Sequence, residues 1–394
     1  MKCLSSRTVS ATAVALLMLS LCGCSGGGAG QENKTNAKPG GSTPAATQTQ
    51  GAKPPADYSV PNPRKPAAGT PARYVLITNG ESPFWSTVRA GMQNAGNELG
   101  VKVDMMVNDG TPQGQIDKLR QIGTQSNVLG VGISVTQAGA VGVIDEMVKL
   151  QKKGVHVITV DSDVDREMYP HARFAFVGTD NLLGGVELGK CAAGLRSQGG
   201  KYITFVGITS AQNAGERIGG FAQGAGDRFE DLGTMGDDID LSRARDNVRN
   251  AIRNHPDLNT LVGIWSYNAP AIVDVVKELN RRKDFTIVTF DAERLAIQAM
   301  ADGMIDAMVV QNPYEMGNQG VRLLKALAEG DERMVGSMFP ELGNPGGNLF
   351  DTGLKVVVPD ENSPLKRDTF GSKTQFMTLG EFKVWLDKYG LTDS

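Results

Sequence analysis

The chain has 394 residues, of which 40% are hydrophobic and 21% are charged, as is ordinary for a globular protein. Its 40 Lys and Arg residues against 43 Asp and Glu residues give a net charge of −3, which excludes a strongly basic nucleic-acid binder. Four cysteines exclude a disulfide-rich scaffold, and three histidines leave little room for a multi-histidine metal site.

The first 24 residues have the pattern of an export signal. Lys2 and Arg7 supply a positive start, and residues 11–21 form an apolar run that is too short to span a bilayer as a helix. The run ends in Leu21-Cys22-Gly23-Cys24, which resembles the lipobox of bacterial lipoproteins. We therefore expect Cys24 to carry lipid that anchors an exported protein to a membrane. A cleaved signal peptide with incidental cysteines is the alternative.

Residues 25–71 are rich in Pro and Gly, and Tyr58 and Val60 are their only large apolar side chains. Such a segment cannot bury enough apolar surface to offset the entropy lost on ordering. We expect a disordered tether that separates the anchor from the folded part.

From Arg73 onward, short Val- and Ile-rich runs alternate with helical stretches. We expect strands at 74–78, 101–107, 128–134, 155–160, 174–177, 202–206, 260–265, 285–290 and 306–310, and helices at 84–99, 137–152, 182–195 and 269–280. This alternation predicts an α/β protein whose parallel sheets are covered on both faces. Because the folded part is too long for one open sheet, we expect two Rossmann-like lobes, with a TIM barrel as the rival fold.

Polar and aromatic residues follow the predicted strands, where open parallel sheets bind their ligands. They are Asn79 to Trp85, Ser134, Asp161 to Asp163, Arg217, Ser266 to Asn268, Asp291, Gln311 and Asn312. Carboxylates and amides accept hydrogen bonds from hydroxyls, Arg donates to oxygens, and aromatic rings cover C–H faces. This chemistry suits a neutral polyol.

Several ordered motifs then resemble the periplasmic sugar-binding family that includes the ribose-binding proteins. They are NGESPFW, ITVDSD, VGTDNLLGG, GERIGGF, YNAPA, VTFDAE and VVQNPYEMG, and the resemblance covers about residues 72–358. It implies the type I periplasmic binding fold, in which two lobes close on a ligand by a hinge.

The resemblance also implies roles for individual residues. Phe84 and Trp85 would sandwich a sugar ring, Asp161 would accept from two hydroxyls, and Arg217 would donate to an oxygen. The remaining ligand-binding candidates are Ser82, Ser134, Ser162, Asn268, Phe290, Asp291 and Gln311. Some have structural alternatives, since Ser82, Asn268 and Asp291 could cap helices and Arg217 could pair with Glu216 or Asp227.

The sequence departs from the ribose-binding pattern at two positions of the expected site. Ser162 stands where that family has an Arg after the first Asp, and Ser82 stands in place of an Asn. These changes remove a donor and put ribose in doubt, and they leave pentoses, hexoses, inositol and a furanose signalling molecule open as ligands. The chain also continues past the usual end of the family, and we expect an added amphipathic helix at 378–391.

The resemblance implies three crossings between the lobes, near 178–181, near 311–313 and within 343–352. The N-terminal lobe would comprise residues 72–178 and about 312–343, and the C-terminal lobe residues 179–311 and about 352–394. Ligand contacts on both lobes would favour the closed form.

We therefore expect an extracytoplasmic solute-binding lipoprotein that captures a monosaccharide or related polyol and delivers it to the permease of an ABC importer. The alternative output is a membrane receptor or kinase that senses the closed form. We expect a monomer with no enzymatic activity, no cofactor, no metal and no nucleic-acid partner. A glycosidase using Asp161 and Asp291 is disfavoured because those residues fall on different lobes, and the export signal argues against a repressor.

Overall fold

The computed structural model describes residues 58–66 and 68–394 of the chain. The predicted export signal, Cys24 and the tether up to residue 57 lie outside the described residues. Within the described part, no helix combines the length and apolar character needed to cross a membrane.

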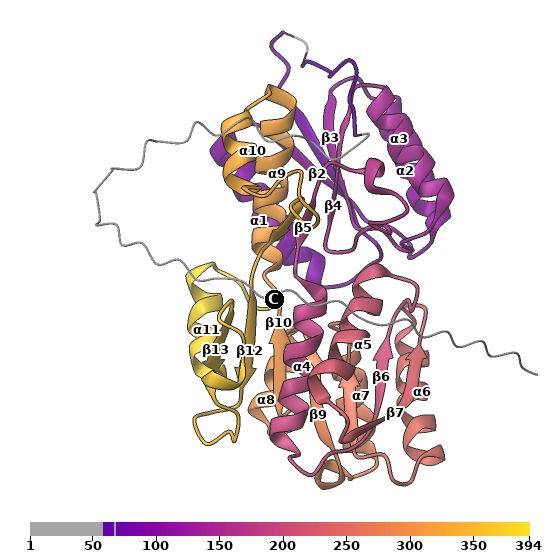
Figure 1. Ribbon diagram of the computed structural model, residues 1–394, viewed down its shortest axis with the longest axis vertical. Helices are drawn as coiled ribbons and strands as arrows, with labels where there is room; N and C mark the ends of the chain where they lie inside the picture. The colour runs from indigo at the N-terminus through magenta and orange to yellow at the C-terminus, as the bar shows by residue number, and fades with distance from the viewer. Residues whose placement is uncertain (1–57, 67) are drawn as a thin grey trace, which may run out of the picture. The chain divides into compact units, whose positions relative to one another are not determined.

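The first sheet has six parallel strands in the order β11-β5-β4-β3-β1-β2 (Figure 1). Its strands are β1 (Arg73–Ile77), β2 (Lys102–Met106), β3 (Val128–Ile133), β4 (His156–Val160), β5 (Phe176–Gly178) and β11 (Leu349–Asp351). Alternate residues of β1 enter different cores, with Tyr74 and Leu76 on one face and Val75 and Ile77 on the other. The sheet is therefore buried on both sides.

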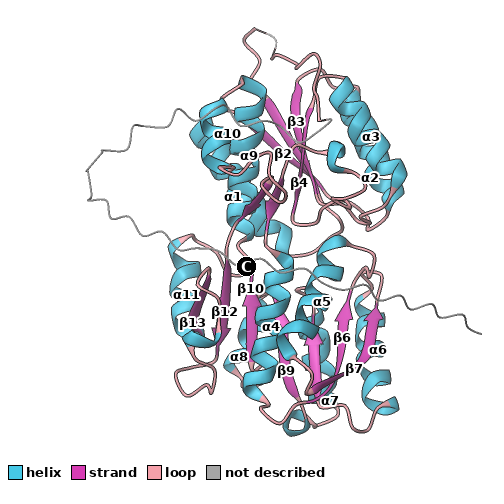
Figure 2. Ribbon diagram, viewed as in Figure 1, coloured by secondary structure: helices cyan, strands magenta, loops and turns pink. Residues whose placement is uncertain are grey.

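Helices cover both faces of this sheet (Figure 2). They are α1 (Phe84–Leu99), α9 (Pro313–Glu329) and α10 (Glu332–Met338) on one side, and α2 (Pro112–Gly123) and α3 (Val141–Lys152) on the other. Gly91 and Gly317 let α1 and α9 pack backbone to backbone, because an added Cβ at either would lie about 2 Å from a carbonyl oxygen.

The second sheet has seven strands in the order β13-β12-β10-β9-β8-β6-β7. They are β6 (Gly200–Val206), β7 (Phe229–Gly236), β8 (Thr260–Gly263), β9 (Thr286–Phe290), β10 (Ala307–Val310), β12 (Leu354–Val358) and β13 (Thr374–Thr378). All neighbours are parallel except β10 and β12, which are antiparallel.

Two groups of helices sandwich the second sheet. One face carries α4 (Asn181–Leu195) and α5 (Gln212–Ala225), and the other carries α6 (Leu241–Asn254), α7 (Asn268–Glu278), α8 (Arg294–Ala301) and α11 (Leu379–Lys388). Short 3₁₀ helices occur at Pro170–Ala172, Arg282–Asp284 and Arg367–Thr369. The α/β class and the pair of Rossmann-like sheets agree with the sequence prediction, and the TIM barrel is excluded.

The chain passes between the sheets three times: from β5 to α4, from β10 to α9, and from β11 to β12. The third passage, at Thr352 and Gly353, begins at the last residue of the predicted range 343–352 and extends one residue beyond it. Residues 349–351, which the sequence assigned to neither lobe, pair with β5 of the first sheet.

The predicted tether extended to Pro71, but its last part is packed against the first sheet. The Tyr58 hydroxyl accepts from the Val157 amide at 3.2 Å, and its ring lies edge-on to Phe174. Arg64 donates to the carbonyls of Lys153 and Val128 at 2.9 and 3.2 Å. The disordered-tether prediction is therefore wrong for this stretch, because Tyr58 and Arg64 find partners in the folded part.

Candidate functional site

A cavity of about 410 Å³ lies where the carboxyl ends of strands from both sheets meet. Its lining comes from the first sheet's loops and α1, from the second sheet's loops and α5, and from the β10–α9 crossing. The lining residues are Asn79, Gly80, Glu81, Ser82, Phe84, Trp85, Asp161, Asn213, Arg217, Ile239, Trp265, Ser266, Tyr267, Asp291 and Gln311.

Two buried carboxylates occupy matching places in the two lobes. Asp161 directly follows β4 and Asp291 directly follows β9, and both adopt left-handed backbone geometry, with φ of 68° and 65°. In each case the backbone amide still donates to the neighbouring strand, Asp161 to Val177 at 3.2 Å and Asp291 to Val309 at 2.8 Å. A non-glycine residue at positive φ is uncommon, so each lobe uses the same unusual backbone geometry at a cavity-lining carboxylate.

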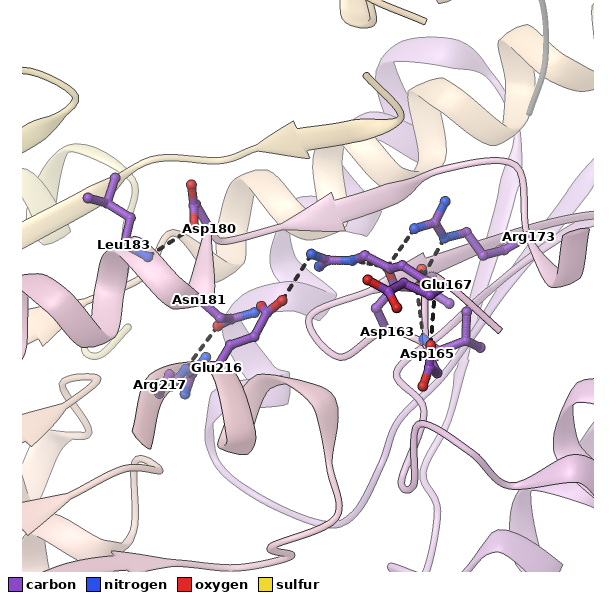
Figure 3. A network of polar contacts seen from close by, with 12 residues as sticks. Asp163, Asp165, Glu167, Arg173, Asp180, Asn181, Leu183, Glu216 and Arg217 are labelled. Carbon is purple, nitrogen blue, oxygen red and sulfur yellow. Dashed lines mark hydrogen bonds and ion pairs between the residues drawn. The ribbon is translucent and has the colours of Figure 1, made fainter. Parts of the chain in front are cut away.

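Arg217 lies between these carboxylates on α5. Its Nε donates to Asn181 Oδ1 at 2.9 Å (Figure 3), and its Nη1 donates to the Ile264 carbonyl at 3.1 Å and lies 3.9 Å from Asp291 Oδ2. The guanidinium stands 3.9 Å from the centre of the Phe290 ring. These contacts hold the planar guanidinium group in place, whereas its Nη2 has no hydrogen-bond partner among the described residues.

The carboxylates are held in an environment that disfavours charge. Burial raises the pKa of Asp291 to about 7, against the opposing effects of Arg217 and of a 2.8 Å hydrogen bond from Gln311. Burial likewise raises the pKa of Asp161, while Arg217 and the Ser134 hydroxyl act to lower it. Burial thus disfavours the charged form of both carboxyl groups.

Four cavity-lining side chains carry a buried polar atom without a hydrogen-bond partner in the part of the chain that the structure describes. These atoms are Asn213 Oδ1, Arg217 Nη2, Trp265 Nε1 and Gln311 Oε1. Two are donors and two are acceptors. Buried polar groups are normally paired, so this cluster marks a place built for a partner with both kinds of group.

Aromatic residues face the cavity from both lobes. Phe84 and Trp85 at the start of α1 line it from the first lobe, and Trp265 and Tyr267 line it from the second. The rings of Phe84 and Trp85 stand at 88° to each other with centroids 5.1 Å apart. These two rings are therefore edge-to-face with each other.

The structure brings together seven of the residues proposed from the sequence: Ser82, Phe84, Trp85, Asp161, Arg217, Asp291 and Gln311 line the cavity. The other four do not line it. Ser134 lies behind the cavity, where its hydroxyl donates to Asp161 Oδ2 at 2.8 Å. Phe290 is fully buried beneath Arg217.

Ser162 and Asn268 do not line the cavity, and their contacts are with the surrounding protein. Ser162 is buried, and its carbonyl accepts from the Val135 amide at 3.1 Å. The Asn268 amide group accepts from the Trp265 amide and donates to Asp237 Oδ2, both at 3.0 Å. Asn268 therefore shapes the turn that presents Trp265, but it does not cap α7, which begins at Asn268 without a side-chain cap hydrogen bond.

Sequence reasoning missed Asn213, Ile239 and Trp265 among the lining residues. Asn213 lies one helical turn before Arg217, so the i, i+4 spacing on α5 could have found it. Trp265 closes an apolar run and looked like part of the strand. Ile239 follows β7, an edge strand with a single buried residue that carries no apolar run. The other missed residues, Asn79, Gly80, Glu81, Ser266 and Tyr267, lie in strand-end loops that the sequence did single out.

Polar contacts also join the two lobes beside the cavity. Arg166 pairs with Asp163 of its own lobe at 2.8 Å and with Glu216 of α5 at 3.0 Å. Asp163 is anchored in turn by the buried Arg173 at 2.6 Å (Figure 3). Ser82 Oγ and Ser266 Oγ meet across the cleft at 3.4 Å.

This arrangement, two doubly wound sheets with a cavity at their facing strand ends, defines a two-lobed binding protein of the type I periplasmic class. The family model for the periplasmic binding protein domain matches residues 73–332, and the chain belongs to that family. Membership implies a protein that acts outside the cytoplasm.

Similar proteins include the ribose import binding protein RbsB of Salmonella typhimurium, 24% identical over 262 residues that cover 66% of this chain and 85% of that protein. The D-allose-binding periplasmic protein of Escherichia coli is 22% identical over 288 residues, which cover 71% of this chain and 90% of that protein. Among solved structures, an ABC transporter solute-binding protein of Burkholderia graminis in complex with D-arabinose has a TM-score of 0.65 at 24% identity. The match covers 77% of this chain and 98% of that protein's chain.

Proposed function

We propose that this protein binds a neutral monosaccharide or related polyol in the cavity between its lobes and delivers it to an ABC importer. The observation that carries the proposal is the set of four buried polar atoms, on Asn213, Arg217, Trp265 and Gln311, that have no partner among the residues the structure describes. A sugar hydroxyl both donates and accepts, so one polyol can satisfy donors and acceptors together.

The charges around the cavity favour a neutral ligand over an anion. Asp161, Asp291 and Glu81 line it together with a single guanidinium, that of Arg217. An anionic ligand would approach the buried Asp161 and Asp291 as well as the exposed Glu81, and an unpaired charge is costly in the buried part of the site. The four aromatic lining residues offer apolar surface to the C–H faces of a sugar ring.

The named ligands of similar proteins support the sugar class. The relatives include ribose and D-allose binders, and a protein of the same fold was solved with D-arabinose. Ser162, where the ribose-binding pattern has an Arg, is buried and does not line the cavity. The cavity therefore lacks the Arg donor that the ribose-binding pattern has at this position. For this reason we favour a sugar other than ribose.

The proposal includes anchoring by lipid on Cys24, with export directed by residues 1–24. Metabolic labelling of the full-length protein with a palmitate analogue tests it. Label should be incorporated in the wild type and lost in Cys24→Ser, whereas Cys22→Ser should keep it. Equal labelling of the wild type and Cys24→Ser would contradict the assignment.

A thermal-shift screen of the protein against pentoses, hexoses and polyols tests the binding function. A ligand present at 100 times its Kd should stabilise the protein by about 2.7 kcal/mol. Trp265→Phe keeps an aromatic ring but removes the Nε1 donor, and it should weaken the binding of that ligand about 3- to 10-fold. Arg217→Ala should abolish the shift.

The matched control is Arg253→Ala, which removes an exposed guanidinium on α6 far from the lining set and should leave the shift unchanged. Absence of any shift with every sugar and polyol in the wild type would contradict the proposed function. Full affinity in both Trp265→Phe and Arg217→Ala would show that the sugar binds elsewhere.

A further inference from the structure

The last residues of the chain return from the second lobe to the rear of the cavity. After α11, Leu391 packs against the core of the second sheet and Tyr389 lies against Tyr314 of α9, with ring centroids 5.3 Å apart. Ser394 is buried, and Figure 1 marks the end of the chain beside β10. We call residues 389–394 the C-terminal segment.

Ser394 is bonded to the backbone behind two cavity residues. Its amide donates to the Ala292 carbonyl at 3.0 Å, and its carbonyl accepts from the Ala292 amide at 2.8 Å. Its hydroxyl donates to the Gln311 carbonyl at 3.1 Å. Ala292 directly follows Asp291, so a single residue fixes the backbone beneath both Asp291 and Gln311.

These bonds lie directly beside Asp291, whose backbone is left-handed. Such a conformation costs free energy in a non-glycine residue and persists only where neighbouring structure enforces it. In the first lobe, the residue after Asp161 is Ser162, and its carbonyl accepts from Val135 of the same lobe. In the second lobe, the matching carbonyl, that of Ala292, accepts from Ser394 of the C-terminal segment.

The same segment reaches the opposite lobe through Asp393. Thr87 Oγ1 donates to the Asp393 carbonyl at 3.3 Å and lies 3.2 Å from its Oδ1. Thr87 is a buried residue of α1, one turn after Phe84, which lines the cavity. Two adjacent residues therefore contact the ligand-binding elements of both lobes.

We propose that Asp393 and Ser394 are positioning residues that hold the cavity-lining groups of both lobes in their binding geometry. This inference rests on the proposed sugar-binding function. The segment lies beyond residues 73–332, the range that the family model matches. It acts on the ligand only through Asp291, Gln311 and α1.

Sugar affinity in Thr87 variants tests the proposal without altering the C-terminal segment or any lining residue. Thr87→Val removes the hydroxyl that reaches Asp393 and should weaken sugar binding about 3- to 10-fold, measured by calorimetric titration. Thr87→Ser keeps the hydroxyl and should restore affinity. Ser86→Ala, at an exposed position on the same helix, is the control and should bind like the wild type.

Removal of residues 393–394 is the stronger variant and should weaken binding at least about tenfold. Wild-type affinity in this truncation and in Thr87→Val would overturn the positioning role. Loss of affinity that Thr87→Ser does not restore would also overturn it, because altered packing of α1 would then be the cause.

Failure of the proposed function gives a different result, in which the wild type itself binds no sugar. Hydrogen exchange then tests the positioning role alone. Thr87→Val should accelerate amide exchange at residues 289–293, which lie on the other lobe, and Ser86→Ala should not. Equal exchange at 289–293 in the wild type and Thr87→Val would overturn it.

Discussion

Two buried serines near Asp161 are matched in size and burial but differ in their contacts. Ser134 donates to the Asp161 carboxylate, whereas Ser162 Oγ has no partner among the residues described. Ser134→Ala should therefore weaken sugar binding about 3- to 10-fold, from the loss of one hydrogen bond to the Asp161 carboxyl group. Ser162→Ala should leave the Kd within about twofold, and calorimetric titration of both variants decides. A larger effect of Ser162→Ala would contradict this assignment.

Asp291 should make the stability of the ligand-free protein depend on pH. Its pKa is raised to about 7 in the folded state, so the folded protein keeps a proton that the unfolded chain releases near pH 3.8. The contribution to the free energy of unfolding is fully present below pH 3.8 and is lost as pH rises through about 7.

Asp291→Asn removes this titration, so urea unfolding at pH 5, 6, 7 and 8 should show a shallower loss of stability than in the wild type. The pKa of Asp237 is raised to about 6, chiefly by burial, and this group acts in the same direction in both proteins. Identical pH profiles for the wild type and Asp291→Asn would contradict the raised pKa.

At the scale of elements, the contact between α4 and α5 sets the position of Arg217. A Cβ at Gly220 would lie 2.3 Å from the Leu182 carbonyl oxygen, whereas a Cβ at Gly219 meets nothing within 4 Å. Gly220→Ala should push α5 from α4, lower stability by at least about 1 kcal/mol and weaken sugar binding. Gly219→Ala should raise stability by about 0.5–1 kcal/mol, because alanine favours the helix.

Chemical unfolding and sugar titration of the two glycine variants check this prediction. If Gly220→Ala and Gly219→Ala behave alike in both measurements, the packing of α5 on α4 does not depend on close contact between their backbones. An affinity loss confined to Gly220→Ala would show that the helix contact positions Arg217.

Elements with strong apolar patterns could be predicted from the sequence, and weakly patterned ones could not. The helix at 84–99 was placed within its observed bounds, because its apolar residues recur at helical spacing. The edge strand β7 was missed because only Phe229 among its residues is buried. Strands β11, β12 and β13 were missed because they follow the end of the regular strand–helix alternation.

The same limit applies to the candidate site. Asp161, Arg217 and Asp291 could be proposed because strand ends mark the binding edge of a parallel sheet. Asn268 also follows a strand end, but its side chain is already hydrogen-bonded to the Trp265 amide and to the Asp237 carboxylate. Whether a side chain at a strand end faces the cavity or its own turn depends on φ and ψ at that residue, which composition and spacing do not specify.

At the scale of the molecule, the Arg166–Glu216 ion pair joins the lobes across the cleft. Both side chains are partly exposed, at 29% and 28%, so the pair is expected to contribute about 0.2–1 kcal/mol. Glu216→Gln should weaken sugar binding up to about fivefold at low salt, and the difference should shrink at 1 M salt as screening increases. Glu167→Gln, an equal charge change at an exposed position beside Arg166, is the control.

Titrations of both variants at low and high salt test this role. An effect of Glu216→Gln that is unchanged by salt, or that Glu167→Gln reproduces, would contradict it. Contacts of this kind lie outside sequence-based prediction, because Arg166 and Glu216 are on different lobes and only the relative placement of the lobes brings them together.

We expect one sugar to bind in the cavity and to pair with the polar atoms there that have no partner within the described part of the chain. A crystal structure with the sugar that gives the largest thermal shift tests it most directly. The account predicts the sugar in the cavity, with Arg217 Nη2 and Trp265 Nε1 donating to its oxygens and Gln311 Oε1 accepting from a hydroxyl. A sugar bound outside this cavity, with those three atoms still unpaired, would contradict it.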